Sequence, residues 1–159
     1  MFKTADLCDA HPDVQVADPL FRDFGGVTVF HGAIVTVKAY EDNTSVRALL
    51  EQQGAGQVLV VDGGGSLRCA LVGDNLAQLG YNNGWAGVVI YGCIRDAAEV
   101  GQIPIGVKAM ATNPRRSKKQ EAGEVNIEVR FAGITFTPGH YLYADADGVI
   151  VSATEIVAE

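Results

Sequence analysis

The 159-residue chain has no apolar run that approaches the ~20 residues needed to cross a bilayer as a helix. It has only three cysteines (Cys8, Cys69 and Cys93) and no CxxC pair, which argues against a disulfide framework and favours reduced thiols. Residues 1–9 lack the apolar core of a signal peptide. We therefore expect a cytoplasmic protein that does not enter a membrane.

Basic residues are also scarce, since 12 Lys and Arg stand against 19 Asp and Glu and give a formal net charge of −7. Direct binding to nucleic acid is not expected, because it requires a basic face. The three histidines (His11, His31 and His140) lack zinc-ligand spacing. The length and the 48% hydrophobic content are those of an ordinary globular protein, so we expect one domain over residues 1–159.

Nineteen glycines separate short apolar runs, a pattern typical of many strands joined by turns. Continuous apolar runs predict buried strands, and capped amphipathic segments predict helices. Strands are expected at 27–30, 33–37, 58–61, 66–72, 86–91, 104–110, 126–131, 134–136 and 148–151, with a bend at His31-Gly32, and helices at 43–54, 74–84 and 96–100. This order predicts an α/β domain with a mixed central sheet or a small barrel-like core.

Three short motifs have both a structural and a functional interpretation. The basic segment 114–119 would suit a phosphate, an RNA or an acidic partner, but the turn signal Asn113-Pro114 favours a solvated loop. The glycine-rich segment 62–66 matches no phosphate-binding loop, which favours a close-packed turn. Residues 145–148 lack the ligands of a calcium loop, so a hairpin turn is expected at Asp147-Gly148.

A fourth pattern points more clearly to chemistry. Gly73-Asp74-Asn75-Leu76 lies between a predicted strand and a predicted helix, and Arg95-Asp96 follows the next predicted strand. Two such units in succession place both turns at one edge of a parallel sheet, and a helix start offers N–H groups to a carboxylate or phosphate. Asp74 and Asp96 suit Mg²⁺ or Mn²⁺, and Arg95 suits a carboxylate or an enolate oxygen. The structural alternative is two helix caps and a surface ion pair.

The Asp-x20-Arg-Asp spacing of Asp74, Arg95 and Asp96 resembles that of the divalent-metal-dependent 4-hydroxy-4-methyl-2-oxoglutarate aldolases. It is also similar to the related proteins named regulators of ribonuclease E activity A. Segments 18–21, 24–26, 58–66 and 141–145 look like the same family, and the resemblance covers nearly the whole chain. It implies a compact single domain of the swivelling β/β/α type that assembles as a homotrimer, with sites near the subunit contacts.

The resemblance also implies a role for each residue of the pattern. Asp96 would hold the metal, partly through water, and Asp74 would orient a metal-bound water. The backbone amides of Gly73, Asp74, Asn75 and Leu76 would bind the substrate carboxylate, and Arg95 would contact the keto or enolate oxygen. The expected reactions are cleavage of 4-hydroxy-4-methyl-2-oxoglutarate to pyruvate and decarboxylation of oxaloacetate, through a pyruvate enolate that the metal and Arg95 stabilise.

Three other functions compete with this interpretation. A non-catalytic protein that binds and inhibits ribonuclease E is the main alternative, although the best-known regulators have lost the Asp-x20-Arg-Asp residues that this chain keeps. A Schiff-base aldolase needs a lysine in apolar surroundings, and Lys38 and Lys108 have such neighbours but no acid–base partner in the sequence. A methyltransferase of menaquinone synthesis, an older label for such proteins, finds no glycine-rich S-adenosylmethionine loop here.

Overall fold

The centre of the structure is a set of parallel strands made from the apolar runs, because a strand covered on both faces carries few polar side chains. The computed structural model describes residues 1–156. In it, β3 (Phe30–Lys38), β4 (Val58–Asp62), β6 (Gly87–Ile94) and β7 (Gly106–Thr112) lie side by side in parallel. The short β5 (Ala70–Val72) pairs in parallel with the end of β6.

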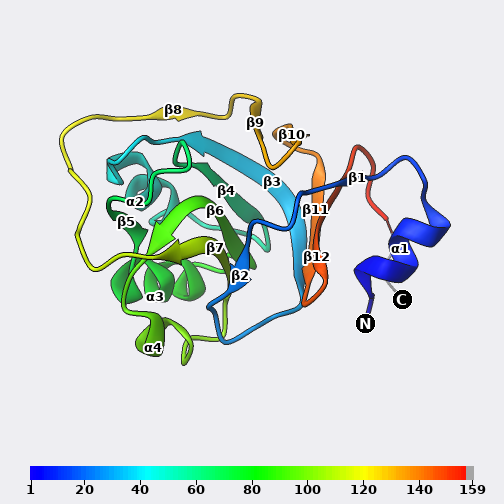
Figure 1. Ribbon diagram of the computed structural model, residues 1–159, viewed down its shortest axis with the longest axis horizontal. Coiled ribbons are helices and arrows are strands. Elements are labelled where there is room, and N and C mark those ends of the chain that lie inside the picture. Colours follow the sequence, from blue (N-terminus) through cyan, green and yellow to red (C-terminus); the bar gives the residue numbers. More distant parts are fainter. Residues whose placement is uncertain (157–159) are drawn as a thin grey trace.

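Antiparallel strands continue this sheet at both sides and make it a mixed, curled sheet of ten strands in the order β1-β12-β11-β3-β4-β6-β7-β2, with β5 and β8 attached to β6 and β3 (Figure 1). The added strands are β1 (Gln15–Val16), β2 (Arg22–Asp23), β8 (Glu124–Val125), β11 (Tyr141–Asp145) and β12 (Gly148–Ser152). A separate hairpin consists of β9 (Val129–Phe131) and β10 (Ile134–Phe136).

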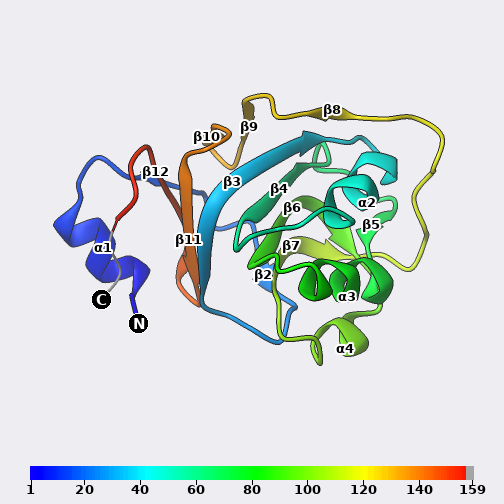
Figure 2. The same ribbon diagram turned by 180° about the vertical axis from the view of Figure 1, so that it is seen from behind.

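The helices lie at two places on the sheet. Figures 1 and 2 show α2 (Thr44–Leu50), α3 (Asp74–Asn82) and α4 (Ala97–Val100) together beside the parallel strands, and α1 (Thr4–Ala10) at the opposite end beside β11 and β12. Along β4, alternate side chains enter two cores. Leu59 and Val61 join the core under the helices, whereas Val58 and Val60 join the core that contains the β9–β10 hairpin.

Most predicted elements are present, and a few differ from the expectation. The expected bend at His31-Gly32 is wrong, because β3 runs unbroken from Phe30 to Lys38. Gly32 is needed for a close approach instead: a β-carbon there would lie 2.1 Å from the carbonyl oxygen of Gly56. The strand expected at 66–72 is reduced to β5, since residues 66–69 form a loop, and β11 was not expected as a strand.

Two of the predicted turns are confirmed. Gly64 and Gly65 have φ of +69° and +72°, and β-carbons on them would press into the rings of Tyr40 and Tyr91, so segment 62–66 is a close-packed turn. β11 and β12 form a hairpin in which Asp145 pairs with Gly148. Among residues 1–156, no helix has the length and the apolar character needed to cross a membrane.

The buried ring of Phe30 lies across glycines of two neighbouring strands, and these glycines set the local spacing of the sheet. A β-carbon on Gly87 would lie 2.4 Å from the ring, and one on Gly106 would lie 2.1 Å from it. Phe30 is 4% exposed and belongs to the core that contains β9 and β10. The ring therefore requires glycine at positions 87 and 106, because any side chain there would collide with it.

Gly106→Ala is expected to lower the free energy of unfolding by about 1–3 kcal/mol, because the added methyl group overpacks the core. Urea unfolding of the variant measures this loss. In a Phe30→Ala background the ring is absent, so the further change Gly106→Ala should cost much less. Strictly additive effects of the two substitutions would contradict this account of the packing.

Candidate active site

The parallel pairing of β5 with β6 brings Asp74, Arg95 and Asp96 together. Val72 at the end of β5 pairs with Ile94 at the end of β6, so both strands release the chain at the same edge of the sheet. The N–H of Arg95 donates to the carbonyl oxygen of Val72 at 3.0 Å, which ties the two turns to each other. The convergence expected from the sequence is therefore present, and we call this group of residues, with Gly73, the corner.

A glycine at position 73 makes the corner possible. One carboxylate oxygen of Asp96, Oδ2, accepts a hydrogen bond of 3.1 Å from the backbone N–H of Asp74. A β-carbon on Gly73 would lie 2.5 Å from this same oxygen and 3.3 Å from Cγ of Arg95. Asp96 itself has φ of +58°, a left-handed conformation that aspartate tolerates better than most residues. This turn of the backbone directs the carboxylate toward the start of α3.

The first turn of α3 binds carboxylate oxygens of the protein itself. The N–H of Asp74 bonds Asp96, and the N–H of Asn75 bonds Oδ1 of Asp74 at 2.8 Å. Within residues 1–156, the N–H groups of Gly73 and Leu76 donate to no acceptor. A helix start attracts anions through such N–H groups and through its dipole. Of the four amides that the resemblance implies for a substrate carboxylate, those of Gly73 and Leu76 therefore have no acceptor within the described part of the chain.

The oxygen donors at the corner fit a hydrated Mg²⁺ or Mn²⁺ ion. Among residues 1–156, no group of three or more His, Cys, Asp or Glu side chains is arranged to hold a metal. Mg²⁺ keeps several waters and needs only one or two carboxylates. Asp96 and Asp74 can supply two, and the absence of a side chain on Gly73 lets the Asp96 carboxylate lie against the start of α3.

Arg95 adds a positive charge on the same side. Its side chain is half-buried, and Nη1 lies 3.5 Å from the carbonyl oxygen of Pro114, at the limit of a hydrogen bond. Most of its N–H donors are therefore available to an anionic ligand.

The basic segment lies beside the corner as part of a longer connection, residues 113–123, that we call the strap. It joins β7 to β8, and Figure 1 shows it in yellow along the edge of the molecule. The backbone of the strap is bound to the sheet: Ala70 N–H donates to the carbonyl of Arg115 at 2.8 Å, and Lys118 N–H donates to the carbonyl of Glu41 at 3.0 Å. The sequence favoured a solvated loop here. The basic side chains of the strap are exposed, as expected, but its backbone is hydrogen-bonded to the rest of the protein.

The side chains of Asp42 and Ser45 hold the second half of the strap. Oδ2 of Asp42 accepts from the N–H groups of Gln120 and Glu121 at 2.8 and 2.9 Å, and Oγ of Ser45 accepts from Gly123 N–H at 2.7 Å. Partial burial alone would raise the pKa of Asp42. The hydrogen bonds from Thr44 and from the strap outweigh it and lower this pKa to about 2, from an ordinary 3.8.

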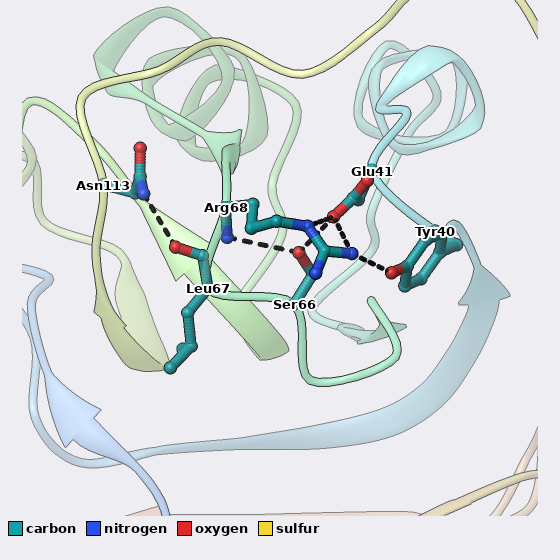
Figure 3. Close-up of polar contacts among 6 residues, drawn as sticks. All are labelled: Tyr40, Glu41, Ser66, Leu67, Arg68 and Asn113. Carbon is teal, nitrogen blue, oxygen red and sulfur yellow. Dashed lines mark hydrogen bonds and ion pairs between the residues drawn. The ribbon is translucent and has the colours of Figure 1, made fainter.

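A second polar network fixes the loop before β5 (Figure 3). Arg68 lies 2.8 Å from Oε2 of Glu41 and also contacts the hydroxyl of Tyr40, and Ser66 donates to the same Glu41 oxygen at 2.5 Å. The Ser66 hydrogen bond, followed by Arg68, lowers the pKa of Glu41. Asn113 at the start of the strap donates to the carbonyl of Leu67 at 2.7 Å. The charge of Arg68 is therefore already neutralised within the protein.

Two hollows border the strap. A small one of about 60 Å³ lies at the corner, and a larger one of about 1060 Å³ extends along the strap and the loop before β5. Arg116, Ser117 and Lys119 line both. Four basic residues (Arg47, Arg95, Arg116 and Lys119) but only two acidic ones line the small hollow, although the whole chain carries −7. This local excess of positive charge suits an anionic ligand.

Other candidates from the sequence lie elsewhere. Lys108 is buried on β7, and its Nζ lies 3.0 Å from Asp23, but it lines a different cavity from the corner. Lys38 is exposed at the end of β3. Burial raises the pKa of the Cys69 and Cys93 thiols, which disfavours a nucleophilic role for them.

The sequence alone did not identify Arg47, Arg116 and Lys119 as neighbours of the corner. Arg47 lies on α2, which packs against α3, and the other two lie on the strap. The four basic residues in segment 114–119 were a signal of some site, but their sequence did not show which edge of the sheet they reach.

Asp42→Asn is expected to destabilise the protein by on the order of 1 kcal/mol at pH 7, a value reduced by solvent screening. The pKa of Asp42 is lower in the folded state than in the unfolded state. Its stabilising effect is thus complete above about pH 4 and is lost as the pH falls toward 2. The difference between wild type and variant should shrink over that range in urea unfolding. A difference that stays the same from pH 7 to pH 3 would contradict the role of this carboxylate.

Comparisons with known proteins agree with the resemblance seen in the sequence. A relative from Aromatoleum aromaticum, named provisionally as a 4-hydroxy-4-methyl-2-oxoglutarate aldolase, is 55% identical over 98% of this chain and 99% of its own. One from Alkalilimnicola ehrlichii with the same name is 56% identical over 97% of this chain and 96% of its own.

Two solved structures share the fold over 99% of this chain, each with a TM-score of 0.96. One, from Geobacillus kaustophilus, is described as an S-adenosylmethionine:2-dimethylmenaquinone methyltransferase, with 50% identity and 99% of its chain covered. The other is described as the RNA-processing inhibitor RraA from Thermus thermophilis, with 43% identity and 96% covered. The model of the RraA-like family, described as Aldolase/RraA, matches residues 4–151, and the chain therefore belongs to this family.

Proposed function

We propose that the protein is a divalent-metal-dependent lyase that cleaves 4-hydroxy-4-methyl-2-oxoglutarate into two molecules of pyruvate. The observation that carries this proposal is the meeting of Asp74, Arg95 and Asp96 at the start of α3, where Gly73 has no side chain to keep the Asp96 carboxylate away. The names of the relatives support the substrate.

The substrate would bind through its 2-oxo acid end. The N–H groups of Gly73 and Leu76 would donate to its carboxylate, and Arg95, which lines the same hollow, would contact the keto oxygen. Asp96 would hold Mg²⁺ or Mn²⁺, partly through water, and Asp74 would orient one of these waters. When bound, the cation supplies positive charge that draws electrons toward the keto oxygen.

Cleavage breaks the bond between C3 and C4 of the substrate. The hydroxyl at C4 loses its proton and becomes the carbonyl of one pyruvate, while the bond electrons form the enolate of the other. Arg95 stabilises the developing enolate oxygen, and Asp74 holds a water that accepts the hydroxyl proton. Return of a proton to C3 completes the second pyruvate. Loss of CO₂ from oxaloacetate would leave the same enolate, so the same residues would serve that reaction.

Asp96→Asn is expected to lower pyruvate release from 4-hydroxy-4-methyl-2-oxoglutarate and from oxaloacetate by at least about 100-fold, because the carboxylate that holds the metal is lost. A lactate dehydrogenase-coupled assay measures the rates, and EDTA should abolish the wild-type rate until Mg²⁺ or Mn²⁺ is restored. Asp13→Asn, at an exposed position away from the corner, is the matched control. If the wild type turns over neither substrate with any divalent cation, the lyase proposal is wrong.

A second function is favoured by the Thermus thermophilis structure, which is described as an inhibitor of RNA processing. On that reading the chain binds ribonuclease E as a protein partner, and Asp96→Asn leaves the binding unchanged. Pull-down of ribonuclease E by wild type and by Asp96→Asn therefore separates the two functions, because Asp96→Asn should lose the lyase activity but keep this binding. The methyltransferase description has less support, since the glycine-rich segment 62–66 is a tight turn that opens no helix.

We also propose a homotrimer with the corner near a subunit contact, as the resemblance implies. Sedimentation equilibrium measures the assembly, and a monomer at micromolar concentration would contradict it.

A further inference from the structure

We propose that Arg116 and Lys119 of the strap bind the second carboxylate of a dicarboxylic 2-oxo acid and thereby make the corner selective for dianionic substrates. This inference rests on the proposed function, since it assumes that the first carboxylate and the keto oxygen bind at the corner. It adds two specificity-determining residues that the Asp-x20-Arg-Asp pattern does not contain.

The size of the small hollow requires a substrate to reach the strap. Its volume of about 60 Å³ is far below the ~300–1,000 Å³ of most small-molecule sites. A six-carbon acid whose first three carbons lie at the corner must therefore extend past its rim. Arg116, Ser117 and Lys119 form that rim, because they line both the small hollow and the larger one.

The two strap side chains are also the uncommitted cations at this rim. Within residues 1–156, neither Arg116 nor Lys119 makes an ion pair or a side-chain hydrogen bond. Of the other cations nearby, Arg68 pairs with Glu41 at 2.8 Å, and Arg47 lies 4.0 Å from Glu51 on its own helix. Arg95 is the cation that the proposed function assigns to the keto oxygen.

The strap holds these cations in place before a substrate arrives. Its backbone is fixed on both sides of Lys119, by the bond of Lys118 N–H to Glu41 and by the bonds of Gln120 and Glu121 to Asp42. Ser117 between the two cations is buried. Binding then orders only the ends of two side chains, which reduces its entropic cost.

Paired substrates provide the test. 4-Hydroxy-4-methyl-2-oxoglutarate and 4-hydroxy-4-methyl-2-oxopentanoate differ only in a carboxylate that the second replaces with a methyl group. Arg116→Ala and Lys119→Ala should each lower kcat/KM for the dicarboxylate about tenfold, the effect of losing one charge-assisted hydrogen bond. For the monocarboxylate the change should stay within about twofold.

Matched controls lie on the same strap. Arg115→Ala and Lys118→Ala remove the same charge, but these residues line only the larger hollow, so they should leave the ratio of the two kcat/KM values unchanged. Equal losses for both substrates, or equal effects of the control variants, would overturn the inference while leaving the lyase function intact.

A binding measurement separates the two proposals. 2-Oxoglutarate and 2-oxopentanoate have the same chain length, and neither has the hydroxyl group needed for cleavage. Calorimetry with Mg²⁺ present should show that wild type binds 2-oxoglutarate more tightly than 2-oxopentanoate, and that Arg116→Ala and Lys119→Ala each lower this preference about tenfold. An undiminished preference in both variants, or no preference in wild type, would contradict the role of the strap even if no substrate is turned over.

Discussion

The site depends on the parallel pairing of β5 with β6. Because Val72 and Ile94 end their strands as partners, the turns that follow begin side by side, and residues that are 22 positions apart share one carboxylate hydrogen bond, from Asp74 N–H to Asp96. The pairing needs no charged residue to hold it. The core beneath it, with Leu71, Val72 and Ile94 each no more than 3% exposed, fixes the strands, so the charged side chains can be arranged for binding rather than for stability.

The sequence predicted the parts of the fold that depend on local patterns. The continuous apolar run of β4 and the hairpin at Asp147-Gly148 follow from side-chain periodicity and turn chemistry, which act over a few residues. The prediction of a bend within β3 was wrong, because Gly32 is required by its close approach to the carbonyl of Gly56, which belongs to a distant segment. Glycines required by such contacts look the same in a sequence as glycines required by a bend.

The candidate site likewise contains residues that local sequence patterns predict and residues that only tertiary contacts bring there. Asp74, Arg95 and Asp96 were identified because strand–turn–helix order carries its own geometry: parallel neighbours must end at one edge. Arg47 and the strap residues reach the corner through the packing of α2 on α3 and through backbone bonds to Asp42. These contacts depend on tertiary structure. A cluster of like charges in the sequence does not show which part of the fold the charged side chains will reach.

Gly73 and Asp96 have a joint consequence for the way related sequences are read. The Asp96 oxygen occupies the volume in which any side chain at position 73 would begin. The residues at positions 73 and 96 therefore depend on each other. In a related chain with a larger residue at 73, a carboxylate at 96 could not keep this position. A related chain with Asp at 96 and a bulky residue at 73 would therefore have a pocket of different shape, even if the rest of its sequence is similar.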